Sequence, residues 1–213
     1  MKQPQLLQAV GQQALQQMSN LSTTPTTSLT KPEQEKTLTI LSKFGDRDQF
    51  LQRVNPKTQA SFAQKKEKAI MGDYPTLTDI CQAYGKTFSF QWLCPQIVDL
   101  SKFTGAKNLD KEQVEGLASI IAAEYRYLKV TELLLFFYFF KTGRYGRFYG
   151  SVDPMVITCA LRDFIKERNV FIDQYERDQH NLQYELNKRN TMTHEQWLEY
   201  KKEHSLENKN EQE

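Results

Sequence analysis

The sequence predicts an all-α protein: a single helical domain with a long C-terminal helix and a disordered N-terminal arm. Three observations lead to this prediction. Helix-capping residues recur ahead of apolar stretches, and one central stretch is apolar on every side. After Pro154, the chain contains no further glycine or proline as far as Asn190. We divide the chain into an arm (1–36), a basic transition segment (37–72), the helical domain (73–190) and a charged C-terminal helix and tail (191–213).

The arm differs in composition from the rest of the chain. Seven of the first 17 residues are glutamine, and Ser, Thr, Pro and Lys follow. Such a segment buries too little apolar surface to offset its chain entropy, so we expect disorder. A short amphipathic helix that docks on a partner is the alternative, because six apolar residues recur at helical spacing: Leu6, Leu7, Val10, Ala14, Leu15 and Met18.

The transition segment is notable for its cations. Over residues 53–68, a single acid, Glu67, stands against five cations, which are Arg53, Lys57, Lys65, Lys66 and Lys68. A solvated helix face is the expected structure of this stretch.

Helix signals become dense after Tyr74. Thr76 is a good N-cap for a short helix that ends at Gly85. Pro95 lies inside the next apolar segment, where it predicts a kink or a break. Asp110 with Gln113 resembles a capping box and opens a central helix.

Two further helices are expected to dominate the fold. Residues 134–140 are apolar on all sides and should form the innermost helix, with a strand as the alternative. Asp153 and Pro154 signal the start of a helix to Asn190, roughly 55 Å long at about 1.5 Å per residue. Its far end must protrude, bend or pack on a second copy, so a homo-oligomer through this helix is a candidate assembly.

The turn TGRYGRFYG after the innermost helix carries the candidate functional residues. Arginines, aromatic rings and glycines alternate there, as in loops that hold phosphates and stack bases. The candidate nucleic-acid-binding residues are Lys141, Arg144, Tyr145, Arg147, Phe148 and Tyr149. One alternative is a helix C-cap at Gly143 followed by aromatic side chains that fold back over the core, with the arginines exposed to solvent. A further alternative is a surface that binds another anion or a protein.

Composition and motifs favour a non-enzymatic protein without metal or cofactor. The three cysteines form no CxxC pair, the histidines lack metal-ligand spacing, and phosphate-loop, GxSxG and HExxH motifs are absent from the sequence. The longest apolar run, 133–140, is far shorter than the ~20 residues of a membrane span, and no secretory signal is seen. We expect a soluble protein in the cytoplasm of a host cell.

The last segment begins with a second capping pair, Thr193 and Gln196, ahead of a helix that carries Trp197. Glutamates recur there at every fourth position: Glu195, Glu199, Glu203, Glu207 and Glu211. They predict an acidic stripe that is either solvated or docks on a basic partner.

The stretches YPTLTDICQAYG, FSFQWLCPQIVDLSKFTG and LKVTELLLFFYFFKTGRYGRFYG resemble an uncharacterised family of small helical proteins from Bacteroidetes genomes, phages and integrated elements. The resemblance covers roughly residues 70–170. It implies an accessory of nucleic-acid transactions that binds DNA, RNA or a replication protein, such as a loader or regulator of a helicase. The alternative is a structural or assembly protein of a phage or mobile element that contacts only other proteins, such as those of a virion.

Overall fold

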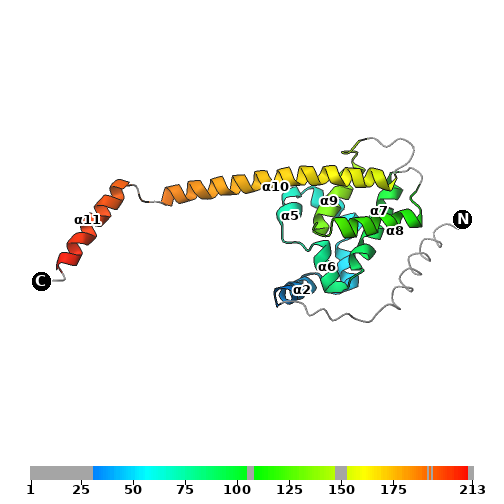
Figure 1. The fold of residues 1–213 in the computed structure, drawn as a ribbon, viewed down its shortest axis with the longest axis horizontal. Helices are drawn as coiled ribbons and strands as arrows, with labels where there is room; N and C mark the ends of the chain where they lie inside the picture. Colours follow the sequence, from blue (N-terminus) through cyan, green and yellow to red (C-terminus); the bar gives the residue numbers. More distant parts are fainter. Residues whose placement is uncertain (1–30, 105–107, 147–152, 191, 193, 211–213) are drawn as a thin grey trace. The chain divides into compact units, whose positions relative to one another are not determined.

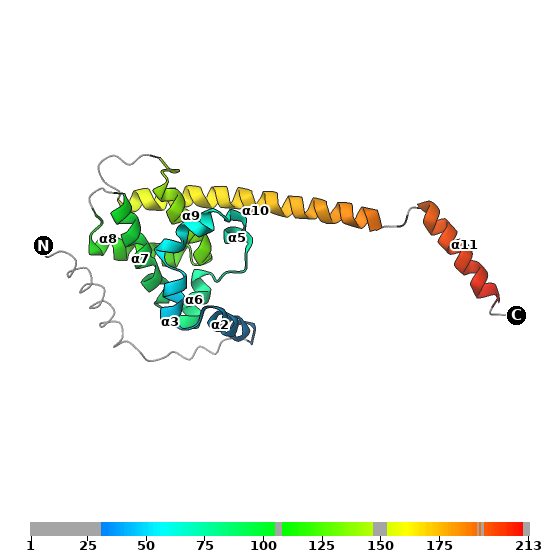
Figure 2. The same cartoon turned by 180° about the vertical axis from the view of Figure 1, so that it is seen from behind.

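The computed structural model describes residues 31–104, 108–146, 153–190, 192 and 194–210, and these ranges are almost entirely helical (Figures 1 and 2). They contain no strand, only an isolated β-bridge between Thr76 and Lys129. The all-α prediction is therefore confirmed. Residues 1–30, which include the predicted arm's apolar positions, lie outside the described ranges.

The chain divides into two compact units, Met1–Thr39 and Ile40–Glu213. In the first unit, the described residues form the start of helix α2 (Lys31–Phe44), where Thr39 donates a hydrogen bond to the carbonyl of Glu35. All elements discussed below belong to the second unit.

The first helices of the second unit contribute to the core, which extends the helical domain upstream of residue 73. After α2 come α3 (Arg47–Arg53), a 3-10 turn η1 (Pro56–Thr58), α4 (Gln59–Ala63) and α5 (Lys66–Met71). They bury a set of side chains that the sequence analysis assigned to the transition segment: Ile40, Phe44, Phe50, Val54, Ala69 and Ile70.

Helix α6 (Leu77–Tyr84) begins and ends as its sequence predicts. Thr76 and Asp79 form a capping box, and Gly85 follows the helix with φ of 111°, a conformation that favours glycine. Backbone hydrogen bonds from Leu77 to Leu128 and from Val130 to Pro75 tie this cap to the segment that leads into α9. The start of α6 thus fixes the start of the innermost helix.

Helix α7 (Phe88–Phe103) runs through Pro95 without a break, so the break that was one of the two predicted outcomes is wrong. Pro95 itself is exposed, whereas Trp92 and Ile97 near it are buried. The indole of Trp92 also donates to the carbonyl of Val54 at 2.7 Å. Burial of these side chains holds the helix together despite the backbone hydrogen bond that proline cannot make.

Helix α9 (Val130–Lys141) is the innermost element, as predicted, and the strand alternative is wrong. It packs against α4, α5, α7 and α10. Its residues from Val130 to Phe137 are all buried, including the polar Thr131 and Glu132. Helix α8 (Lys111–Glu124), which begins at the predicted capping box of Asp110 and Gln113, packs against α7 and α10.

Helix α10 (Pro154–Asn190) is continuous over the predicted range, and α11 (His194–Asn210) follows it. Asp153 caps α10 by accepting a hydrogen bond from the Val156 amide at 2.9 Å. Figures 1 and 2 show the first part of α10 beside α5 and α9. Ile157, Leu161 and Phe164 are buried there, and every residue from 176 to 188 is exposed.

Candidate functional site

The turn after α9 has the glycine-dependent geometry that its sequence suggests. Gly143 and Gly146 adopt φ angles of 75° and 107°, which side chains other than glycine rarely tolerate. The amides of Gly143 and Arg144 donate to the carbonyls of Phe140 and Phe139, so the turn closes the C-terminus of the helix. The helix end that was the alternative interpretation of this turn is therefore present, with Thr142 as the C-cap and Gly143 as the residue after it. Three candidate residues, Arg147, Phe148 and Tyr149, lie outside the described residues.

Lys141 is held inside the protein. Its ammonium forms an ion pair with Asp99 of α7, and its side chain is only 14% exposed. The same ammonium lies 5.5 Å from the ring centre of Phe103. These contacts join the end of α9 to α7, and they leave little of this cation for a ligand.

Arg144 lies at the surface and is oriented by two contacts. Its guanidinium is 2.8 Å from the carboxylate of Glu167 on α10, and both side chains are about two-fifths exposed at 42% and 41%. The guanidinium carbon also lies 4.6 Å from the ring centre of Phe139. Arg144 is therefore preorganised, and it is still open to solvent.

Tyr145 is packed onto the core. Its ring centre lies 6.0 Å from that of Phe136, and its hydroxyl is buried without a hydrogen-bond partner among the described residues. Burial, followed by the nearby Glu167 carboxylate, raises the pKa of this phenol above its ordinary value. Of the three described candidates, only Arg144 is exposed to a ligand.

Replacing Tyr145 by phenylalanine should leave the free energy of unfolding unchanged or raise it by up to about 1 kcal/mol, because the variant removes a buried hydroxyl that lacks a partner. Because the pKa of the Tyr145 phenol is raised in the folded protein, ionisation of the phenol opposes folding. The stability that depends on the neutral phenol is therefore complete below the ordinary tyrosine pKa of about 10 and is lost at higher pH. Denaturant titrations at neutral and alkaline pH should show a shallower alkaline loss in the variant. A clear loss of stability at neutral pH would contradict the prediction.

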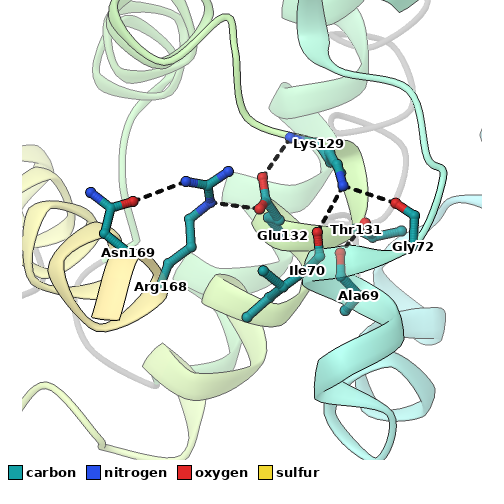
Figure 3. Close-up of polar contacts among 8 residues, drawn as sticks. All are labelled: Ala69, Ile70, Gly72, Lys129, Thr131, Glu132, Arg168 and Asn169. Atoms are coloured by element: carbon teal, nitrogen blue, oxygen red, sulfur yellow. Dashed lines mark hydrogen bonds and ion pairs between the residues drawn. The ribbon is translucent and has the colours of Figure 1, made fainter. Parts of the chain in front are cut away.

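A second polar cluster joins α5, α9 and α10 in the interior (Figure 3). Glu132 is fully buried, and its carboxylate accepts from the Arg168 guanidinium at 2.6 Å and from the Lys129 amide at 2.8 Å. The Lys129 ammonium donates to the carbonyls of Ile70 at 2.7 Å and Gly72 at 2.9 Å.

This cluster supplies hydrogen-bond donors to the carbonyls at the C-terminal end of α5. The last carbonyls of a helix lack partners within the helix, and a cation there is favoured by the helix dipole. Thr131 adds a hydrogen bond to the carbonyl of Ala69 at 2.7 Å. Its internal contacts mark the cluster as structural. The sequence analysis missed it, although Glu132, an acid in an otherwise apolar helix, was a usable signal.

The comparisons with known proteins concern the second half of this fold. Residues 110–210 match a family of unknown function (DUF6633). The matched stretch begins at the capping residue of α8 and ends with α11, so it contains Glu132, Arg144 and Arg168 and leaves out α2 to α7. No curated protein and no solved structure matches the chain. A resemblance to an uncharacterised family is thereby supported.

Two kinds of feature are absent from the described residues. Within these ranges, no three His, Cys, Asp or Glu side chains come together in a way that could hold a metal ion. None of the helices described is both long enough and apolar enough to cross a membrane.

Proposed function

We propose that the protein is a non-enzymatic assembly protein that binds a protein partner through the second half of α10. The observation that carries this proposal is an apolar face without a covering element among the described residues. Leu182 and Leu186 are 57% and 44% exposed, although they continue the side of α10 that packs on the core at Phe164 and Phe171.

Helix geometry supports a single continuous face. At 3.6 residues per turn, Leu182 and Leu186 point within about 20° of the direction of Tyr175, and Phe164 and Phe171 lie on the same side. Tyr184 is on the opposite side of the helix. A stripe of this kind is typical of a helix that docks in a groove or pairs with another helix.

Charge indicates the chemistry of the partner. Over residues 173–188, two cations, Arg177 and Lys188, stand against four acids, which are Asp173, Glu176, Asp178 and Glu185. Helix α11 adds exposed aromatic side chains, Trp197 and Tyr200, and there Glu195 and Glu199 are balanced by the exposed Lys201 and Lys202. We therefore propose a partner with an apolar surface bordered by lysine or arginine, for which electrostatic complementarity would favour association.

The nucleic-acid and replication-protein functions expected from the turn remain predictions, as does a phage or mobile-element setting. The internal contacts of Lys141 and Tyr145 favour the assembly alternative over base stacking on this turn.

The double change Leu182→Asp and Leu186→Asp should weaken binding of a helical peptide with a leucine stripe and flanking lysines by about tenfold or more, which corresponds to about 1.4 kcal/mol. Tyr184→Asp, on the opposite side of α10, is the control and should bind as the unchanged protein does. Calorimetric titration measures the affinities, and thermal melting should show that both variants fold.

Equal binding by both variants would contradict the proposal. Light scattering after size exclusion tests a second copy as the partner: we expect a monomer. If the protein is instead a dimer and Leu182→Asp dissociates it, the partner of this α10 face is a second copy of the chain and not a basic protein.

A further inference from the structure

A cation from the transition segment lies beside the candidate turn. Lys66, the first residue of α5, is half-buried, and its ammonium lies 4.5 Å from the ring centre of Phe171 on α10. It forms no ion pair or hydrogen bond with any described residue. Burial, and then the positive charge of Arg144, lower the pKa of Lys66, while Glu167 opposes them. The ammonium is thus held in place by an aromatic ring and lacks its own counter-ion.

Arg144 contacts the same helix, α10. Its partner Glu167 is one helical turn before Phe171 on α10, so the two cations stand over neighbouring positions of one helix face. Phe139 holds the guanidinium as Phe171 holds the ammonium. Glu167 therefore pairs with Arg144 and acts on Lys66 only through its nearby charge.

The local charge favours an anion. Asp163, one turn before Glu167, is already paired with Lys166 at 2.9 Å. Lys66 and Arg144 consequently retain a net charge of about +1 after Glu167 is counted. A like-charged pair at partial exposure is unfavourable, and an anion that contacts both cations would relieve the repulsion.

We propose that Lys66 and Arg144 form a binding site for a phosphate group where α5, the turn after α9 and α10 meet. Phosphate suits this pair because its oxygens accept hydrogen bonds from both a planar guanidinium and an ammonium. Arg144 has only Glu167 as a polar partner among the described residues, so further N–H groups of the guanidinium remain for the ligand. The phosphate belongs either to a free anion or to a nucleic-acid backbone.

The site differs from the one predicted on the turn. It retains Arg144, replaces Lys141 with Lys66, and does not use Tyr145 as a stacking platform. It is also separate from the protein-docking face of α10, because the proposed anchors Leu182 and Leu186 lie three to four turns further along the helix than Phe171. Failure of either proposal leaves the other standing.

The test uses the full chain and two matched double variants. Lys66→Gln with Arg144→Gln removes the proposed site, and Lys65→Gln with Lys68→Gln removes two exposed charges from the same segment. Inorganic phosphate, with acetate at equal ionic strength as the reference, is titrated while the melting temperature is followed. A labelled single-stranded oligonucleotide is titrated by fluorescence anisotropy.

We expect phosphate to raise the melting temperature of the unchanged protein and of the Lys65/Lys68 variant, but not of the Lys66/Arg144 variant. If the source is a nucleic acid, the Lys66/Arg144 variant should also bind the oligonucleotide about tenfold or more weakly. Its slope of log affinity against log salt should fall by about 1.4 for two lost phosphate contacts. A phosphate effect without oligonucleotide binding identifies a free anion as the ligand.

A third variant separates binding from general charge effects. Glu167→Gln removes the carboxylate that competes for Arg144, so phosphate should bind it more tightly than the unchanged protein. The proposal is overturned if phosphate acts no differently from acetate. It is also overturned if the two double variants lose the phosphate effect equally.

Discussion

Replacing Arg168 by leucine should lower the free energy of unfolding by about 3–5 kcal/mol, one of the two largest effects expected in this protein. The change leaves the fully buried carboxylate of Glu132 without its cation. Among the contacts drawn in Figure 3, the Lys129 amide is then its remaining donor. Urea denaturation of the two proteins measures the difference.

Two controls define the cause of this loss. Arg177→Leu removes the same charge from an exposed position of the same helix and should change stability by about 0.5 kcal/mol or less. The double variant Glu132→Leu with Arg168→Leu should recover much of the loss, because a buried pair replaced by apolar side chains is often near neutral. A cost for Arg168→Leu no greater than for Arg177→Leu would show that the ion pair contributes little.

Phe136→Ala should cost about 3–5 kcal/mol, because it removes a fully buried ring from the centre of the aromatic core. This ring lies 5.7 Å from Phe164 of α10 and 6.0 Å from Tyr145 of the turn, so the cavity would open between three parts of the chain.

Phe103→Ala is the matched control for this prediction. Its ring is 62% exposed at the end of α7 and contacts the Lys141 ammonium, a contact worth about 1 kcal/mol or less. In denaturant titrations, Phe136→Ala should therefore lower the free energy of unfolding by at least about 2 kcal/mol more than Phe103→Ala does. Equal losses would mean that the surroundings of Phe136 collapse to fill the space.

Local signals in the sequence were sufficient for much of the fold. A capping box is a contact between residues three apart, so Thr76 with Asp79 and Asp110 with Gln113 can be recognised without tertiary information. The apolar stretch of α9, residues 133–140, was likewise predictable as a buried helix, because only burial suits a helix that is apolar on all sides. The break expected at Pro95 is wrong, because tertiary packing of its neighbours outweighs its effect on the backbone.

Contacts between distant parts of the chain could not be predicted. Lys141 and Arg144 look like free cations in the sequence, but their partners are Asp99, 42 residues away, and Glu167 on the next helix. Lys66 was noticed only as one cation of a charged segment, and its position beside Arg144 depends on how α5 packs against α10. Between α2 and residue 73 the helices have at most seven residues, so their apolar residues form no long periodic pattern.

The enclosure of α9 affects how the protein is made. Its neighbours α4, α5 and α7 precede it in the chain, while α10, which supplies Phe164 and Arg168, follows it. During synthesis, α9 is therefore complete before the segment that covers its remaining side exists. At 5–20 residues per second, residues 142–168 take roughly 1–5 s to add. Burial of α9, the most apolar of the described helices, can therefore be completed only after the first part of α10 has been made.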